Sequence, residues 1–307
     1  MPLYEIKRLM VGLDMTEMDD VLIAYINRLI EAFDFDTVYF LHVAKELKLP
    51  DRVKEKYPDL LAPVDETIER DIQQKVSEKF VPREGVTCKV EIKEGDPVES
   101  ILRWSEIKNI DLMVMGRKLD LEGQGNLPLK LARVAHCSML FIPEHHKFRL
   151  KSVLMSVDFS KTSSLALEAG VRIKAKVDVN LILHNAYEVP SGYHFTGKSF
   201  EEFKEIMEHN ALEDAYEFIA KNGMQKDDVE YALTFDDEED PGERAYEVAT
   251  ERHADLIIIA SQGRTELASF LLGSIAEKMI RYSSNIPLLI VKDKKENLGF
   301  FDALLRI

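Results

Sequence analysis

The feature that most constrains this 307-residue chain is an internal duplication. Residues 7–16 resemble residues 151–160: each is an apolar run followed by an aspartate and, two positions later, by a hydroxyl residue. Residues 110–116 resemble residues 254–260 at the same spacing of 144 positions. A repeat on this scale means that one structural unit occurs twice along the chain.

Short apolar runs alternate with helical patterns such as residues 21–30 and 203–218. Nearly unbroken apolar strands between helices are typical of a parallel sheet that is covered on both faces and joined by right-handed crossovers. The sequence therefore predicts an α/β fold with two tandem domains, each a five-stranded, parallel, open, Rossmann-like sheet with helices on both faces. We place the domains at residues 1–145 and 150–293, followed by a tail at 294–307.

Composition excludes several classes of function. The net charge is -15, whereas proteins that bind nucleic acid or anionic membranes nonspecifically carry clustered Lys and Arg. No apolar run reaches the roughly 18 residues of a membrane helix, and the N-terminus has no apolar signal core. The two cysteines form no CxxC motif. We therefore expect a cytoplasmic protein without a nucleic-acid or membrane partner.

A loop with two glycines follows the apolar run 256–259 and is the best candidate for a ligand site. Gly263 and Gly273 lie ten residues apart, and Ser274 then begins a helical pattern. The first N–H groups of a helix have no intrahelical partner and carry partial positive charge, so such a start suits a phosphate. An ordinary tight turn is the alternative explanation for the glycines.

Asp158 follows a predicted strand at the same edge of the sheet, where ligands of open parallel sheets bind. Its carboxylate is placed to accept a hydrogen bond from a ribose hydroxyl or an adenine amino group. The alternative is that Asp158 caps the helix that begins near Thr162.

These motifs resemble the universal stress protein family in its tandem form. The resemblance rests on Val-Asp-Phe-Ser at 157–160, on Leu-His at 183–184, and on the glycine loop that runs through Gly-Ser at 273–274 into Ala-Glu-Lys-Met-Ile-Arg. It covers almost the whole chain and is stronger in the second half. It implies an adenine nucleotide alpha hydrolase-like fold and a second domain that binds ATP, ADP or AMP, with Mg²⁺ accompanying the phosphates.

The resemblance also implies a regulatory, stress-response role without dedicated catalytic residues, and a homodimer. The residues that it implies for the nucleotide site are Ser156, Val157, Asp158, Asn185, Ala260, Gly263, Arg264, Gly273, Ser274, Ile275 and Ala276.

Both halves depart from the family pattern. In the second half Ala260 stands in place of the first motif glycine. In the first half Gly116 is kept, but Leu119 occupies the second motif position and the loop is four residues shorter. We therefore predict that the first half contains a degenerate, structural or differently liganded site, in which Asp14 caps its helix.

Other functions have weaker support in the sequence. The chain has no G-x-x-x-x-G-K-[ST] or G-x-S-x-G motif and no convergent metal-ligand spacing, so we predict no catalytic and no metal-binding residues. The acidic segment 236–242 is interpreted as a solvated turn and helix start. A slow ATPase or nucleotidyl transferase, and an interaction protein with two empty sites, remain as alternatives. The amphipathic tail at 297–307 docks either onto its own chain or onto a partner protein.

Overall fold

The computed structural model describes residues 6–45, 64–118, 125–237, 240–262, 272–282 and 285–293. Gly263, Arg264, Leu119 and the C-terminal tail lie outside these ranges. The chain divides into two compact units, residues 1–148 and 149–307.

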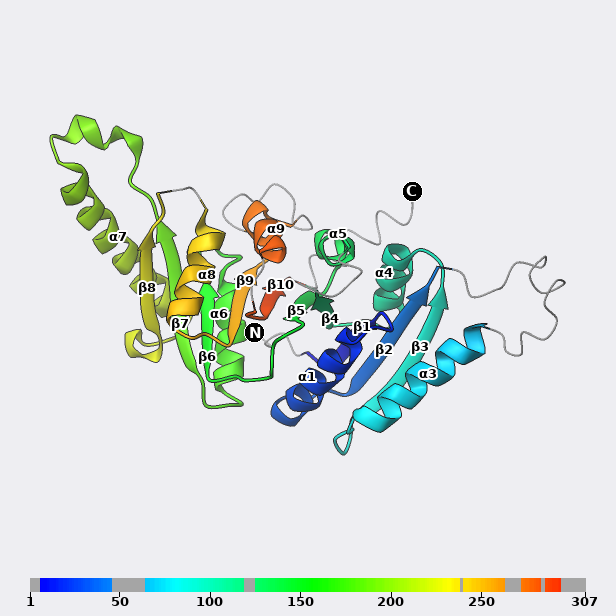
Figure 1. Ribbon diagram of the computed structural model, residues 1–307. Helices are drawn as coiled ribbons and strands as arrows, with labels where there is room; N and C mark the ends of the chain where they lie inside the picture. Colours follow the sequence, from blue (N-terminus) through cyan, green and yellow to red (C-terminus); the bar gives the residue numbers. More distant parts are fainter. Residues whose placement is uncertain are drawn as a thin grey trace. The chain divides into compact units, whose positions relative to one another are not determined.

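The first unit is a parallel sheet with the strand order β3-β2-β1-β4-β5. Helices α1 and α3 cover one face of this sheet, and α4 and α5 cover the other (Figure 1). Its elements are β1 (Arg8–Leu13), α1 (Met18–Ala32), β2 (Thr37–Ala44), α3 (Val64–Lys79), β3 (Thr87–Glu94), α4 (Pro97–Ile107), β4 (Leu112–Arg117), α5 (Leu127–Val134) and β5 (Ser138–Pro143).

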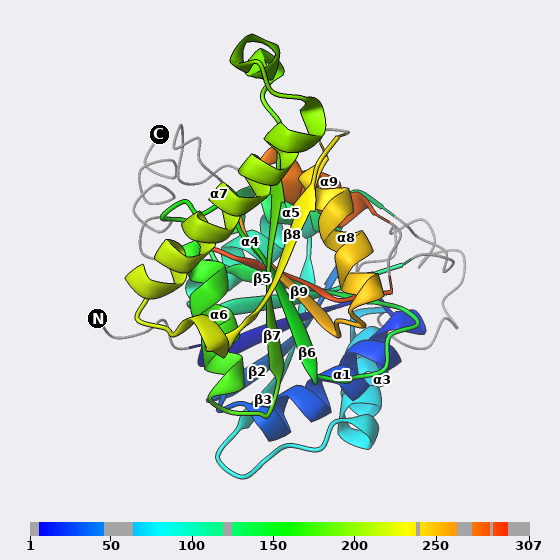
Figure 2. The same cartoon turned by 90° about the vertical axis from the view of Figure 1, so that its left-hand side faces the viewer.

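The second unit repeats this topology with the order β8-β7-β6-β9-β10, and again every strand pair is parallel. Figure 2 shows α6 and α7 on one face of its sheet and α8 and α9 on the other. Its elements are β6 (Ser152–Ser156), α6 (Ser164–Lys174), β7 (Asn180–Tyr187), the short helix η1 (Ser191–Thr196), α7 (Phe200–Lys221), η2 (Lys226–Asp228), β8 (Glu230–Phe235), α8 (Pro241–Glu251), β9 (Leu256–Ala260), α9 (Ser274–Arg281) and β10 (Leu288–Val291).

The central strands explain why the sheets form. Leu9, Met10 and Val11 of β1 are fully buried, as are Ile257 and Ile258 of β9. Strands with apolar side chains on both faces require helices on both faces, and burial of such side chains contributes about 1.5–3 kcal/mol each. The α/β fold with two five-stranded parallel sheets is therefore confirmed.

A buried aspartate joins the first and fourth strands in each unit. Asp111, just before β4, accepts hydrogen bonds at Oδ2 from the backbone N–H groups of residues 7 and 8, at 2.9 and 2.8 Å. Asp255, just before β9, accepts in the same way from Lys151 and Ser152, at 2.8 and 3.1 Å. Each carboxylate thereby fixes the beginning of β1 or β6 beside the strand that follows the aspartate.

The duplication extends to unusual backbone conformations. Met15 and Phe159, each directly after the strand-end aspartate, have φ of 63° and 61°. Asn109 and His253, two residues before the buried aspartates, have φ of 51° and 52°. Positive φ is uncommon outside glycine, so the matching pairs indicate that both units turn the chain in the same way at these points.

Removal of the Asp255 carboxylate should weaken the second unit. Asp255→Ala leaves the N–H groups of Lys151 and Ser152 without their acceptor, and we expect a loss of about 2 kcal/mol of unfolding free energy. Hydrogen exchange measured by mass spectrometry should become faster in β6 peptides and stay unchanged in β1 peptides. The matched variant Asp111→Ala should show the opposite pattern. Unchanged exchange in both variants would contradict this role of the two aspartates.

Candidate functional site

The candidate site lies where the strand order of the second unit reverses. β6 is paired with β7 on one side and with β9 on the other, so the chain leaves these central strands in opposite directions. In the β6–β9 pair Ser156 is opposite Ile259, which brings residues 157–158 and residues 260–261 to neighbouring strand ends. A crevice at such a reversal is the usual ligand site of an open parallel sheet.

A buried histidine supports the end of β6. His184 of β7 is fully buried; its Nδ1 lies 3.1 Å from Ser156 Oγ and its Nε2 lies 3.0 Å from Thr234 Oγ1. Burial lowers the pKa of His184 to about 4, so the ring is neutral at pH 7. One ring nitrogen then donates and the other accepts, and the two hydroxyls can take either role. His184 therefore fixes the Ser156 side chain, a function that the Leu-His pattern alone did not reveal.

Asn185 holds the turn that follows β6. Its Nδ2 donates to the carbonyl of Val157 at 2.8 Å, and both residues are buried. The next residue, Asp158, accepts a hydrogen bond at Oδ1 from the N–H of Ser160 at 3.1 Å. Helix α6 begins later, with Ser163 in the N-cap position. The alternative in which Asp158 caps this helix is therefore wrong, and the aspartate belongs to the strand-end turn.

Gly273 closes the glycine loop at its C-terminal end. Its N–H donates to the carbonyl of Ser261 at 2.7 Å, which brings the start of α9 back to the end of β9. A Cβ at this position would lie 3.2 Å from that carbonyl oxygen and 3.6 Å from the Cα of Gln262. The backbone φ of -65° suits any residue, so glycine relieves a close contact here and is not required for its conformational freedom.

The N-terminus of α9 has no side-chain cap, because Gly273 occupies the N-cap position. By contrast, Asp240 caps α8 by accepting from the N–H of Glu243 at 3.2 Å. The other oxygen of Asp240 accepts from Lys278 at 3.1 Å and from the Tyr282 hydroxyl at 2.7 Å. Asp240 thereby ties the body of α9 to α8 while the first turn of α9 keeps its outward N–H groups.

The acidic segment before α8 begins the helix as predicted, but its first carboxylate is not solvated. Asp236 is only 4% exposed, and its Oδ1 accepts from the N–H of Asp240 at 3.1 Å. Within the described ranges, no three His, Cys, Asp or Glu side chains are arranged to hold a metal ion.

Nine of the eleven predicted site residues are described, and they lie on strand ends or on the start of α9. Ser156 ends β6, Val157 and Asp158 follow it, Asn185 lies in the neighbouring β7, and Ala260 ends β9. The first turn of α9 carries the remaining four: Gly273, Ser274, Ile275 and Ala276.

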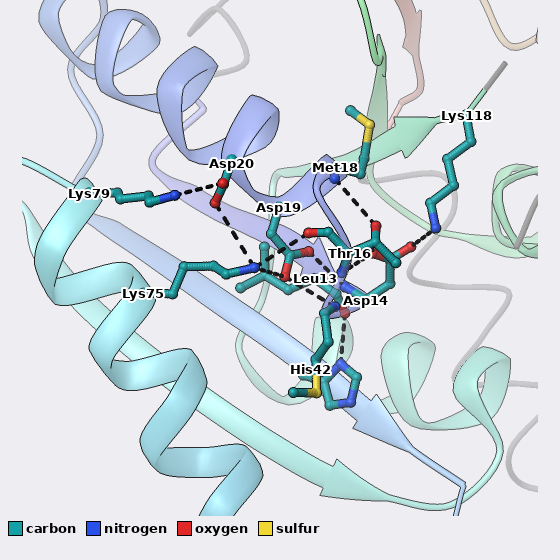
Figure 3. Close-up of polar contacts among 11 residues, drawn as sticks. Leu13, Asp14, Thr16, Met18, Asp19, Asp20, His42, Lys75, Lys79 and Lys118 are labelled. Atoms are coloured by element: carbon teal, nitrogen blue, oxygen red, sulfur yellow. Dashed lines mark hydrogen bonds and ion pairs between the residues drawn. The ribbon is translucent and has the colours of Figure 1, made fainter. Parts of the chain in front are cut away.

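The corresponding place in the first unit has a different polar network (Figure 3). Lys118 Nζ lies 2.6 Å from Asp14 Oδ2, while Asp14 Oδ1 accepts from the hydroxyl and the N–H of Thr16 at 2.6 and 3.1 Å. Burial alone would raise the pKa of Asp14, but the hydrogen bonds from Lys118 and Thr16 outweigh it, so the pKa lies below its usual value. The N-cap of α1 is Glu17, so the prediction that Asp14 caps this helix is wrong.

Asp19 holds the same turn from inside the first unit. It is fully buried, and its oxygens accept from the N–H groups of Asp14 and Met15 at 2.9 and 3.1 Å. Lys75 of α3 donates to Asp19 at 3.2 Å. Burial raises the pKa of Asp19, and these hydrogen bonds only partly offset it.

One hollow in the described part of the chain lies beside β8, away from the ends of β6 and β9. It measures about 560 Å³ and is lined by residues 231–234 of β8 and by side chains of α7 and α8.

No helix in the described ranges is both long and apolar enough to span a bilayer.

The pH dependence of the second unit should report the burial of His184. The unfolded chain binds a proton near pH 6.5 and the folded chain only near pH 4, so stability should fall as the pH drops between these values, by up to about 3 kcal/mol. His184→Gln does not titrate and should remove this slope in urea unfolding between pH 7 and pH 5. An NMR signal of the His184 ring that titrates above pH 6 would contradict the assignment.

Curated relatives match one half of this chain at a time. Universal stress protein MJ0577 of Methanocaldococcus jannaschii is 29% identical over 161 residues, which is 47% of this chain and 96% of the relative. Universal stress protein YxiE of Bacillus subtilis is 30% identical over 154 residues, which is 46% of this chain and 97% of the relative.

Solved structures match the chain over nearly its full length. A functionally unknown protein from Pseudomonas aeruginosa, PA1789, has a TM-score of 0.67 at 14% identity, and the match covers 98% of both chains. A universal stress protein from Archaeoglobus fulgidus has a TM-score of 0.63 at 19% identity, and the match covers 94% of this chain and 99% of the other. At these identities the likeness concerns the fold alone.

The model of the universal stress protein family matches the sequence twice, over residues 5–143 and over residues 149–292. These two ranges follow the two compact units and the duplicated strand-end turns. The chain therefore belongs to the universal stress protein family and contains two copies of its domain in tandem.

Proposed function

We propose that the second unit binds an adenine nucleotide, ATP, ADP or AMP, and that the protein acts as a regulatory binding module. The observation that carries this proposal is the start of α9. It has no side-chain cap, and Gly273 holds it against the end of β9, beside the strand end that carries Asp158.

The groups at the start of α9 fit a phosphate. The backbone N–H groups of Ser274, Ile275 and Ala276 belong to the first helical turn, where N–H groups lack intrahelical acceptors. The partial positive charge at the helix N-terminus adds to this preference for an anion. Ser274 is exposed and brings a hydroxyl donor. A Cβ at Gly273 would be tight against the Ser261 carbonyl oxygen, at 3.2 Å, so the glycine lets the start of α9 lie close to the end of β9.

The groups at the end of β6 fit a nucleoside. Asp158 is an acceptor for ribose hydroxyls or for an adenine amino group, and its turn is fixed by the hydrogen bond from Asn185 to Val157. Ser156 presents a hydroxyl that neutral His184 holds in place. An acceptor on one strand end and N–H donors on the next match the two ends of a nucleotide.

The methyl group of Ala260 does not oppose this proposal. In the first unit a Cβ on Gly116 would collide with the Met18 side chain. The positions of the second unit that lie 144 residues later are Ala260 and Thr162. Thr162 lies in the turn before α6 and has a shorter side chain than methionine, so the second unit has no methionine at this position to oppose the methyl group of Ala260.

We further propose that Mg²⁺ accompanies the bound phosphates and that the protein acts in the cytoplasm as a homodimer. Because no cluster of three metal-ligating side chains occurs in the described residues, phosphate oxygens and water would supply most of the ligands of the ion.

Nucleotides released from the purified protein by denaturation, identified by mass spectrometry, test the proposed function. Titration calorimetry with ATP follows if none is carried through purification. Asp158→Asn should weaken binding about tenfold or more, because it removes a charged acceptor, and Gly273→Val should weaken it further by displacing the start of α9. The matched control is Asp14→Asn in the first unit, which should leave affinity unchanged. Absence of nucleotide in both experiments would refute the proposal, and fast ATP turnover lost in Gly273→Val would favour an enzyme.

A further inference from the structure

We propose that Lys118 and Met18 fill the first unit's equivalent of this crevice, so that the first unit holds its own side chains where the second unit takes a ligand. This inference rests on the proposed function in one respect: the excluded ligand is taken to be the nucleotide proposed for the second unit. Its physical basis is a set of contacts within the first unit and does not depend on what the second unit binds.

Lys118 bridges the point at which the strand order of the first unit reverses. β1 and β4 are neighbours, Asp14 follows β1, and Lys118 follows β4. The Nζ–Oδ2 distance is 2.6 Å, and the Lys118 side chain is only 8% exposed. Figure 3 shows the lysine reaching across to the aspartate. The buried ammonium group therefore donates to the carboxylate across the two neighbouring strand ends.

Both oxygens of Asp14 are engaged by the first unit itself. Oδ2 receives Lys118, and Oδ1 receives the hydroxyl and the N–H of Thr16. A ribose hydroxyl would compete with the ammonium group for Oδ2 of Asp14, whose side chain is 49% exposed. Moving the ammonium group away would separate the 8% exposed lysine side chain from this carboxylate, which is unfavourable for a buried charge.

The second unit has a neutral residue at the matching position. Gln262 lies 144 residues after Lys118. It comes two residues after Ala260, just as Lys118 comes two residues after Gly116. A neutral amide cannot form an ion pair with Asp158. The two matched strand ends therefore differ in charge: the first carries the ammonium group of Lys118 and the second a neutral amide.

Met18 fills the space above the adjacent glycine. It is 1% exposed, and its side chain occupies the position that a Cβ on Gly116 would need. The first residue of α1 thus covers the backbone of β4 at Gly116. The residue at the matching position of the second unit is Thr162, in the turn before α6, with three side-chain heavy atoms where Met18 has four.

The charges around the first crevice balance without a ligand. Asp19 pairs with Lys75 at 3.2 Å, and Asp20 pairs with Lys79 at 2.6 Å. The matching positions of the second unit, Ser163 and Ser164, are neutral. The first turn of α1 thus carries two carboxylates that are paired within the unit, where the second unit has two serines.

The test transplants the second unit's residues into the first. Lys118→Gln and Met18→Thr are combined with Asp158→Asn, which silences the second unit, and binding of radiolabelled AMP is measured by equilibrium dialysis. AMP is chosen because the loop of the first unit is four residues shorter than that of the second, and AMP has only one phosphate for it to surround. We expect at least a tenfold gain in AMP affinity over Asp158→Asn alone, and the gain should disappear when Asp14→Asn is added. The matched control Lys118→Arg, which keeps the charge, should give no gain.

A folded triple variant that binds AMP no better than Asp158→Asn would overturn the inference, as would two AMP molecules per wild-type chain. If the wild type binds no AMP but the triple variant does, the inference stands and the proposed function fails.

A second measurement uses the wild-type chain and does not depend on how the variants fold. Acetylation by a water-soluble active ester should modify Lys118 at least tenfold more slowly than Lys221, whose side chain is 74% exposed. Asp14→Asn should speed the modification of Lys118. Equal rates at Lys118 and Lys221 in the wild type would overturn the inference.

Discussion

The parallel pairing of the first and fourth strands is the constraint on which the rest of each unit depends. In both units this pair marks the point at which the strand order reverses, and a buried aspartate fixes where the first strand begins. Because the strands are parallel, the segments that follow them emerge side by side at one edge of the sheet. The positions of Asp14 and Asp158 follow from this pairing, as do those of Lys118 and the loop that begins at Ser261.

The two units apply this geometry to different chemistry. In the second unit the chain returns to the end of the fourth strand at Gly273, whose N–H donates to Ser261, and α9 begins there without a side-chain cap. In the first unit the residue after the fourth strand is a lysine that is already paired with the strand-end aspartate. A gene duplication thus preserved the backbone, including the positive φ at residues 15 and 159, while the polar groups at the crevice diverged.

Much of the fold was predictable, because periodicity and duplication report directly on the backbone. The apolar runs predict the strands, and the spacing of 144 residues predicts which strand ends correspond in the two units. The role of Gly273 as the closing point of a loop also agreed with its place before a helical pattern. These features depend on neighbours in sequence or on the repeat itself.

The polar contacts within the site were less predictable, because they join residues far apart in sequence. The His184 contacts with Ser156 and Thr234 require three strands in register, and nothing at residue 184 alone indicates a buried neutral ring. Asp14 was interpreted as a helix cap because a nearby helix start is a common partner of aspartate, whereas its partner lies 104 residues away. A direct comparison of Lys118 with Gln262 was the one signal in the sequence that could have indicated this difference.

The central claim is that one chain contains one open nucleotide site and one site closed by its own side chains. A crystal structure of the full chain grown with millimolar ATP tests this most directly. The account predicts density for the nucleotide between Asp158 and the first turn of α9, with Lys118 still on Asp14 in the first unit. Nucleotide density beside Asp14, or an empty crevice in both units, would contradict it.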